Sequence, residues 1–328
     1  MSKAVIGLDF GMNEVKMAVM DQKSLLKTCS FKTPERLVKN GWITSQQVMG
    51  EFLKDSLKKV KTGTRSCAVV LPSAVALTRC IEMPVMTTEQ LEMNLPFEFR
   101  DYIDQGKEKY QFDYAVLDMP ENKDAEDAQM QLMACAALKS DLKNMMQMLR
   151  AAGLKAVTLI PVEFAYRNLI RHSLSRTQEP VCIIDFGHEA TRIYIYRGEH
   201  YEITRVLDHG GLEMDEALSE HLAFGPMESS RHKSSLPEEM LSSPEMLEIY
   251  RTIALDVMRA INFYNYDTQS NLRKAYVTGG CATNPVLLSE VKEVSGIRLV
   301  PIDELLPSGC ESSDDKLLYA AAVGAAWQ

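Results

Sequence analysis

The sequence predicts an α/β protein built from two related lobes. The first observation is an internal repeat: an apolar run ends in Asp-x-Gly at Leu8-Asp9-Phe10-Gly11 and again at Ile184-Asp185-Phe186-Gly187. Each copy is followed by a second apolar run, as in a β-hairpin. The second observation is the pair Gly279-Gly280, which follows a strand-like run and precedes a helical pattern. Glycine turns and strand-to-helix junctions both present backbone N–H groups that can bind phosphate. The two lobes are therefore expected to close on one nucleotide.

The first lobe is expected to begin with three sequential strands at residues 3–10, 14–20 and 25–32, where apolar residues alternate between short turn signals. A helix over residues 45–60 follows, because its apolar residues share one helical face and Ser45 can cap its N-terminus. The remaining elements of this lobe are predicted as strands at 66–71, 77–83 and 156–160 and a helix at 162–174.

Residues 84–154 interrupt this lobe with a different pattern of helix, strand, strand and helix. Thr88 and Ser140 are the expected N-caps of the two helices. The acidic segment 121–127 joins the two strands and is typical of a solvated loop. The lobe would close without this block, so we expect an inserted α-β-β-α subdomain with a role other than nucleotide binding.

The second lobe repeats the three-strand pattern at 181–187, 191–197 and 200–207. A helix follows Gly210-Gly211, and the Ser-rich segment 225–235 is expected to be mobile. A long helix at 244–266 leads to the Gly-Gly strand, and small residues at 317–326 predict a helix packed on a sheet. The predicted division is 1–83 and 155–178 for the first lobe, 84–154 for the inserted subdomain and 179–328 for the second lobe, with a helical sub-lobe at about 212–262.

Composition limits the function classes. The chain has 328 residues, which suits two domains, and a formal net charge of -9 without a Lys/Arg block, which disfavours nucleic acid and anionic membranes as partners. We find no signal peptide and no run long enough to span a bilayer. The seven cysteines are scattered, as in reduced cytosolic proteins, and no His or Cys spacing indicates zinc.

The three glycine motifs, in this order, resemble the phosphate-1, phosphate-2 and adenosine motifs of the actin-like ATPase superfamily. Within it, the chain resembles PilM-type proteins of type IV pilus assembly, with the cell-division protein FtsA as nearest relative. The resemblance rests on four sequence motifs: Glu82-Met83-Pro84, Asp113-Tyr114-Ala115-Val116-Leu117, Leu149-Arg150-Ala151-Ala152-Gly153-Leu154 and Arg259-Ala260-Ile261-Asn262-Phe263-Tyr264. The resemblance covers nearly the whole chain. It implies an actin-like fold, with two RNase H-like domains flanking a nucleotide cleft.

The resemblance implies ATP or ADP with Mg²⁺ as the ligand. Asp9 and Asp185 are the expected metal-binding residues, acting through water, because Mg²⁺ prefers carboxylates and retains its waters. The predicted nucleotide-binding residues are Asp9, Gly11, Asn13, Lys16, Asp185, Gly187, Thr191, Gly210, Gly211, Gly279, Gly280 and Cys281.

Several of these positions depart from the family pattern. Met12-Asn13 replaces a hydroxyl-bearing pair, Glu189 replaces the second glycine of phosphate-2, and Cys281 replaces the third glycine of the adenosine loop. We therefore expect nucleotide binding with weak or absent hydrolysis. Glu189 has three interpretations: it repels the γ-phosphate, it orients a water as general base, or it points to solvent. Lys16 either faces the phosphates or lies at a strand edge in solvent.

For PilM-type proteins the resemblance implies a partner, the short cytoplasmic tail of the inner-membrane protein PilN, docked at the inserted subdomain. No amphipathic helix follows the last predicted helix, so membrane contact is expected only through that partner, at the inner face of the membrane. Two alternatives stay open: a small-metabolite kinase of the same superfold, and an FtsA-like filament-forming division protein. Self-association is also left open.

Overall fold

A computed structural model describes residues 4–39, 41–122, 127–174, 177–222, 238–308 and 316–327. The predicted Ser-rich segment 225–235 and the middle of the acidic loop 121–127 lie outside the described residues. Across the described ranges, every helix is too short or too polar to cross a bilayer.

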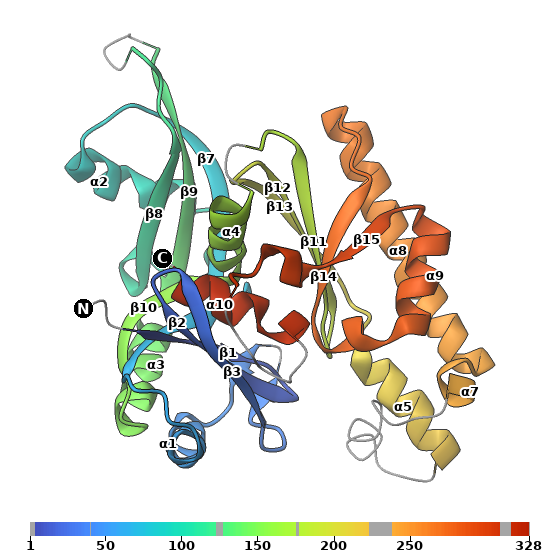
Figure 1. Cartoon of the computed structure of the whole chain (residues 1–328). Coiled ribbons are helices and arrows are strands. Elements are labelled where there is room, and N and C mark those ends of the chain that lie inside the picture. Colours follow the sequence, from blue (N-terminus) through green and yellow to red (C-terminus); the bar gives the residue numbers. More distant parts are fainter. Residues whose placement is uncertain are drawn as a thin grey trace.

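Two five-stranded sheets with the same strand order form the body of the molecule (Figure 1). The first sheet has the order β3-β2-β1-β6-β10 and the second the order β13-β12-β11-β14-β15. In each sheet the three-strand meander is antiparallel, and the last two strands run parallel to its first strand. The strands of the first sheet are β1 (Val5–Phe10), β2 (Glu14–Asp21), β3 (Ser24–Lys32), β6 (Ser66–Leu71) and β10 (Lys155–Pro161). Those of the second are β11 (Pro180–Phe186), β12 (Thr191–Arg197), β13 (His200–Leu207), β14 (Lys274–Thr278) and β15 (Arg298–Pro301). The repeat seen in the sequence is therefore a repeat of the whole sheet.

Helices cover the outer face of each sheet. The first sheet packs against α1 (Gln46–Lys59) and α3 (Lys139–Ala151). The second packs against α5 (Gly211–Leu222), α8 (Pro244–Thr268) and α9 (Pro285–Ser295). Ser45 is the N-cap of α1, as predicted, and its hydroxyl accepts from the Val48 N–H at 3.4 Å. Shorter elements are β4 (Val38–Lys39), β5 (Trp42–Ile43), α7 (Glu238–Leu241), and 3₁₀ turns at Lys107–Lys109, Gly280–Thr283, Ile302–Leu305 and Lys316–Tyr319.

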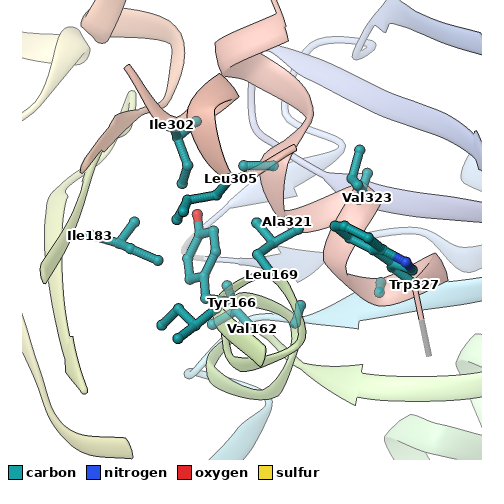
Figure 2. Close-up of a cluster of buried hydrophobic side chains, with 14 of the residues drawn as sticks. Val162, Tyr166, Leu169, Ile183, Ile302, Leu305, Ala321, Val323 and Trp327 are labelled. Carbon is teal, nitrogen blue, oxygen red and sulfur yellow. The ribbon is translucent and has the colours of Figure 1, made fainter. Parts of the chain in front are cut away.

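Two helices, α4 (Val162–Ser173) and α10 (Ala320–Ala326), lie between the sheets and share one core with both of them (Figure 1). Figure 2 shows Tyr166 and Leu169 of α4 between Ile183 of the second sheet and Val323 of α10. Although it follows the second lobe in sequence, α10 contacts β1, β2 and β6 of the first. This closing helix thus packs outside the lobe to which the division at 179–328 assigned it.

Glycine and alanine make this arrangement sterically feasible. A Cβ at Gly7 on β1 would lie 1.8 Å from the Ala322 carbonyl oxygen, and one at Gly324 would lie 2.1 Å from the Ala165 carbonyl oxygen. Backbones this close leave no room for a side chain. The small residues of 317–326, noted in the sequence, therefore allow α10 to lie between β1 and α4.

The inserted block is a three-stranded sheet with one helix, consisting of β7 (Ala76–Pro84), α2 (Thr88–Glu98), β8 (Tyr110–Asp118) and β9 (Gln129–Leu138). Because β7 pairs with β9, it belongs to the same sheet as the rest of the block. By strand pairing the block therefore begins at β7, before residue 84, where the sequence analysis placed its start. The helix α3, which the prediction gave to the block, packs its Met148 and Leu149 into the core of the first lobe. The block thus has the order β-α-β-β.

Both predicted caps in this region are wrong. Thr87 caps α2, in a capping box with Gln90, so the start of the helix was predicted one residue late. Leu138 precedes α3 without a side-chain cap, because strand β9 continues directly into the helix.

Candidate nucleotide-binding cleft

The two Asp-x-Gly hairpins have turns of equal length, each beginning at its glycine. The Gly11 N–H donates to the Glu14 carbonyl at 3.0 Å, and a Cβ at Gly11 would lie 2.8 Å from that oxygen. In the second copy, a Cβ at Gly187 would lie 2.6 Å from the Ala190 carbonyl. Such separations are far below van der Waals contact, so both turns require glycine.

Strand register brings an acid opposite a cation in each hairpin. Asp9 pairs with Lys16 across β1 and β2, and Asp185 pairs with Arg192 across β11 and β12. Side chains alternate between the faces of a strand. Because Leu8 and Ile184 point into the outer cores, their neighbours Asp9 and Asp185 point to the inner faces, where the lobes oppose each other.

These inner faces border a cleft of about 690 Å³ between the lobes. It is lined by most of the predicted residues, namely Asp9, Gly11, Asn13, Lys16, Asp185, Gly187, Glu189, Gly279, Gly280 and Cys281. Its apolar walls include Val70, Val162 and Tyr194. A cleft of this volume, with converging charged and glycine groups, is typical of a small-ligand site.

Lys16 lies inside this cleft, and its Nζ is 3.2 Å from the Asp9 carboxylate. Burial lowers the pKa of Lys16, but Asp9 and Asp185 raise it by more, so the net pKa lies above its ordinary value. Lys16 therefore remains charged. Burial raises the pKa of Asp185, against the lowering effect of Lys16 and Arg192.

Asp9 and Asp185 come from opposite lobes, and both line the cleft. The described residues include no group of three His, Cys, Asp or Glu side chains placed to hold a metal ion. A site with two carboxylates fits Mg²⁺ that keeps several waters.

The double glycine has one constrained and one open member. Gly279 has a φ of +96°, and a Cβ there would lie 2.4 Å from the Asp185 carboxylate. A Cβ at Gly280 would meet no atom within 4 Å. The Cys281 thiol donates to the Gly187 carbonyl at 3.5 Å, so the loop that follows Gly279-Gly280 contacts the turn at Gly187.

Thr191, Gly210 and Gly211 lie outside the lining of the cleft. The Gly211 N–H donates to the Gly187 carbonyl at 3.1 Å, and a Cβ at Gly210 would lie 2.7 Å from the His188 carbonyl. Thr191 is 1% exposed and alternates with Arg192, so it faces the outer core. Gly210 and Gly211 therefore pack against the turn at Gly187 and His188 without lining the cleft.

Sequence reasoning missed six polar residues of the cleft lining, namely Glu14, Lys32, Ser73, His188, Arg192 and Thr283. Three of them, His188, Arg192 and Ser73, have contacts or positions that bear on the site. His188 joins the lobes, because its Nδ1 is 3.0 Å from the Asn13 side-chain amide and 3.6 Å from buried Asp215. Arg192 also lines the cleft, and its signal was present in the repeat: it occupies the position that Lys16 has in the first copy. His188 carries no comparable signal in the sequence.

Ser73 is the third of these residues, and it connects the cleft to a buried acid. Its hydroxyl donates to the Glu163 carboxylate at 2.6 Å, and the Thr78 hydroxyl donates at 3.1 Å. Burial raises the pKa of Glu163, against the lowering effect of these hydrogen bonds. Glu163 itself is 2% exposed and does not line the cleft.

Comparison with known families decides the identity. The family model described as type IV pilus assembly protein PilM matches residues 7–313. The chain belongs to the PilM family. This confirms the predicted family, and the matched range includes all three glycine motifs and the inserted block.

Solved structures agree with this PilM assignment at the level of the fold. A chain of a PilM–PilN type IV pilus biogenesis complex is 22% identical over 98% of this chain and 97% of that one, with a TM-score of 0.82. The ethanolamine utilization protein EutJ from Carboxydothermus hydrogenoformans is 15% identical over 98% and 88%, with a TM-score of 0.61. ADP-bound MreB5 of Spiroplasma citri is 11% identical over 98% and 94%, with a TM-score of 0.55. These likenesses confirm the actin-like fold, and none favours the alternative of a metabolite kinase or a division protein.

Proposed function

We propose that this PilM-family chain binds ATP or ADP with Mg²⁺ between its lobes and serves as a nucleotide-dependent scaffold of pilus assembly. The observation that carries the proposal is the pair of matched hairpins, each with a glycine turn, an acid and a cation, opposed across one cleft. A ligand that contacts both lobes would favour their closed arrangement in proportion to its difference in affinity for open and closed states.

The binding is tested by thermal unfolding. Millimolar ATP with Mg²⁺ should raise the melting temperature of the wild-type protein, because a ligand of the folded state stabilises it by mass action. Asp9→Ala should abolish the increase. Asp21→Ala, at the exposed far end of the same hairpin, should retain it. If no adenine nucleotide changes the melting temperature of the wild-type protein, the proposal fails.

Hydrolysis is expected to be weak or absent, and Glu189 is the residue to examine. Its position in the cleft lining supports a role beside the phosphates over a solvent position. If Glu189 repels the γ-phosphate, Glu189→Gly should tighten ATP binding. If it orients a water, Glu189→Gln should bind ATP normally and lose the residual turnover. Unchanged affinity and rate in both variants would assign it a solvent position instead.

We further propose that the chain docks the cytoplasmic tail of a PilN-like membrane protein where the inserted block meets the first lobe, at the inner face of the membrane. At this junction α3 contacts β9 and β10, and β10 contacts β7. Exposed apolar side chains lie on two of its elements: Met146 on α3 and Val157 on β10. Among the described strands, β10 is one of the two edge strands of its sheet, and an edge strand can pair with an extended peptide.

A charge placed on this edge tests the docking position. Val157→Asp should weaken binding of a synthetic tail peptide by about tenfold or more, because it places a charge where an apolar anchor packs. Leu26→Asp is the control: Leu26 is 52% exposed and lies on β3, at the opposite edge of the same sheet from β10. Isothermal titration with both variants measures the difference. Equal affinities would move the docking site elsewhere.

A further inference from the structure

Arg192 is a cleft arginine whose guanidinium has no bonding partner in the described parts of the chain. Arg167, Arg197 and Arg259 each hold a carboxylate at 2.7 to 2.9 Å. Arg192 makes no such ion pair and no side-chain hydrogen bond to a described residue, although it lines the cleft. An arginine has five N–H donors, so one that lines a cleft without a protein partner is placed to donate to the acceptors of a ligand.

The nearby carboxylates do not use this guanidinium. Glu163 accepts from Ser73 and Thr78, and Asp185 accepts from the Tyr166 hydroxyl at 3.4 Å. Asp185 is the cross-strand neighbour of Arg192, yet it lies beyond ion-pair distance. The positive charge of Arg192 lowers the pKa of Glu163 and of Asp185 without a hydrogen bond to either carboxylate. Its N–H donors therefore stay available for a ligand.

The position of Arg192 repeats that of Lys16. A Cβ placed on Gly11 would lie 3.4 Å from the Lys16 Nζ, and one placed on Gly187 would lie 3.6 Å from an Arg192 Nη. Each cation therefore lies next to the glycine turn of its own lobe. Lys16 is partly neutralised by Asp9, whereas Arg192 is the one lysine or arginine of the second lobe that lines the cleft within the described residues.

We propose that Arg192 is the second-lobe anchor for the polyphosphate of the nucleotide, and that it makes affinity rise with the number of phosphates. This inference rests on the proposed nucleotide site. A planar guanidinium binds phosphate oxygens in pairs, and charge-assisted pairs of this kind are stronger than neutral hydrogen bonds. ATP, with more negative charge than ADP, gains more from the anchor.

The test compares ATP and ADP affinities, each with Mg²⁺, by isothermal titration. Arg192→Gln should raise the Kd for ATP about tenfold or more and that for ADP by a smaller factor. Arg192→Lys keeps the positive charge but loses the planar guanidinium with its paired N–H donors. Its Kd for ATP should lie between those of the wild type and Arg192→Gln. Arg205→Gln is the control, because Arg205 lies over the Phe263 ring outside the cleft lining and should leave both affinities unchanged.

A melting curve without ligand confirms that each variant is folded before it is titrated. An ATP affinity of Arg192→Gln within about twofold of wild type overturns the proposal. A loss of equal factor for ATP and ADP also overturns it, since the anchor would not distinguish them. Failure of the wild-type protein to bind either nucleotide would instead refute the proposed nucleotide site itself.

Discussion

At the scale of single residues, the double glycine shows how neighbouring positions of one type serve different purposes. Gly279 has a left-handed φ, and a Cβ there would lie 2.4 Å from the Asp185 carboxylate. Gly280 has open space at its Cβ position and lines the cleft. The first glycine is therefore required by the backbone, and the second leaves room for a ligand.

Substitutions separate these two roles. Gly279→Ala should destabilise the protein by about 1–3 kcal/mol or more, because it combines backbone strain with a clash. Gly280→Ala should leave both stability and nucleotide binding near wild type. Gly280→Trp should abolish the nucleotide-induced rise in melting temperature while leaving the melting temperature without ligand nearly unchanged. Loss of stability in Gly280→Ala would contradict this assignment.

The buried acid Glu163 predicts a pH dependence of stability. Burial is the main cause of its raised pKa, so the folded chain binds this proton more tightly than the unfolded chain does. Its contribution to stability is full below the unfolded pKa and is lost as pH rises through the folded pKa. Compared with Glu163→Gln, which has no such proton, the wild-type protein should lose melting temperature as pH rises above about 4.5, the ordinary pKa of a glutamate. A melting temperature of the wild-type protein that rises with pH relative to Glu163→Gln would contradict this prediction.

At the scale of elements, the inserted block leaves and re-enters the first lobe at adjacent residues. Ala76 on β7 pairs with Ala137 on β9, and both alanines belong to the core of the first lobe. The block also touches the second lobe, where the Cys80 thiol meets the Tyr201 carbonyl at 2.6 Å. A hairpin turn at the Ala76–Ala137 pair would therefore keep both attachment points of the block in place, while removing the Thr78 hydrogen bond to Glu163 and Met133 of the shared core.

We predict that replacing residues 77–136 with Asn-Gly keeps the nucleotide-induced rise in melting temperature and removes capture of the tail peptide. Asn-Gly suits a two-residue hairpin because both positions tolerate positive φ. The deletion must spare α3, because Met148 and Leu149 belong to the first-lobe core; a longer deletion of 86–153 is expected to unfold that lobe. Tail binding by the shortened protein would show that the docking site does not involve the block.

At the scale of the whole molecule, one hydrophobic core joins the lobes through α4 and α10 (Figure 2). Unfolding should therefore be a single cooperative transition. Leu169→Ala, in that core, should cost about 2–5 kcal/mol and lower the melting temperature of the whole protein. Leu26→Ala, at a side chain that is 52% exposed, should change stability by less than about 0.5 kcal/mol. Two separate transitions in scanning calorimetry would show that the lobes unfold independently.

The sequence alone determined the local elements and their repetition. Alternating apolar residues predicted both three-strand meanders, and Asp-x-Gly predicted both hairpins, because strand period and turn chemistry depend on neighbouring residues. The family followed from motif order. The cap of α2 was missed by one residue, since Thr87 and Thr88 are equally good caps in isolation.

Only the tertiary structure decided which elements belong together. Pairing of β7 with β9, packing of α3 on the first lobe and placement of α10 between the sheets all depend on contacts between distant residues. The same holds in the cleft, where His188 meets Asn13 across 175 positions of sequence. A related reason explains why Thr191, Gly210 and Gly211 do not line the cleft. Packing between distant residues determines which face of a strand is buried and which path a loop follows. Local patterns specify strands and turns, whereas long-range packing specifies which side chains share a cleft.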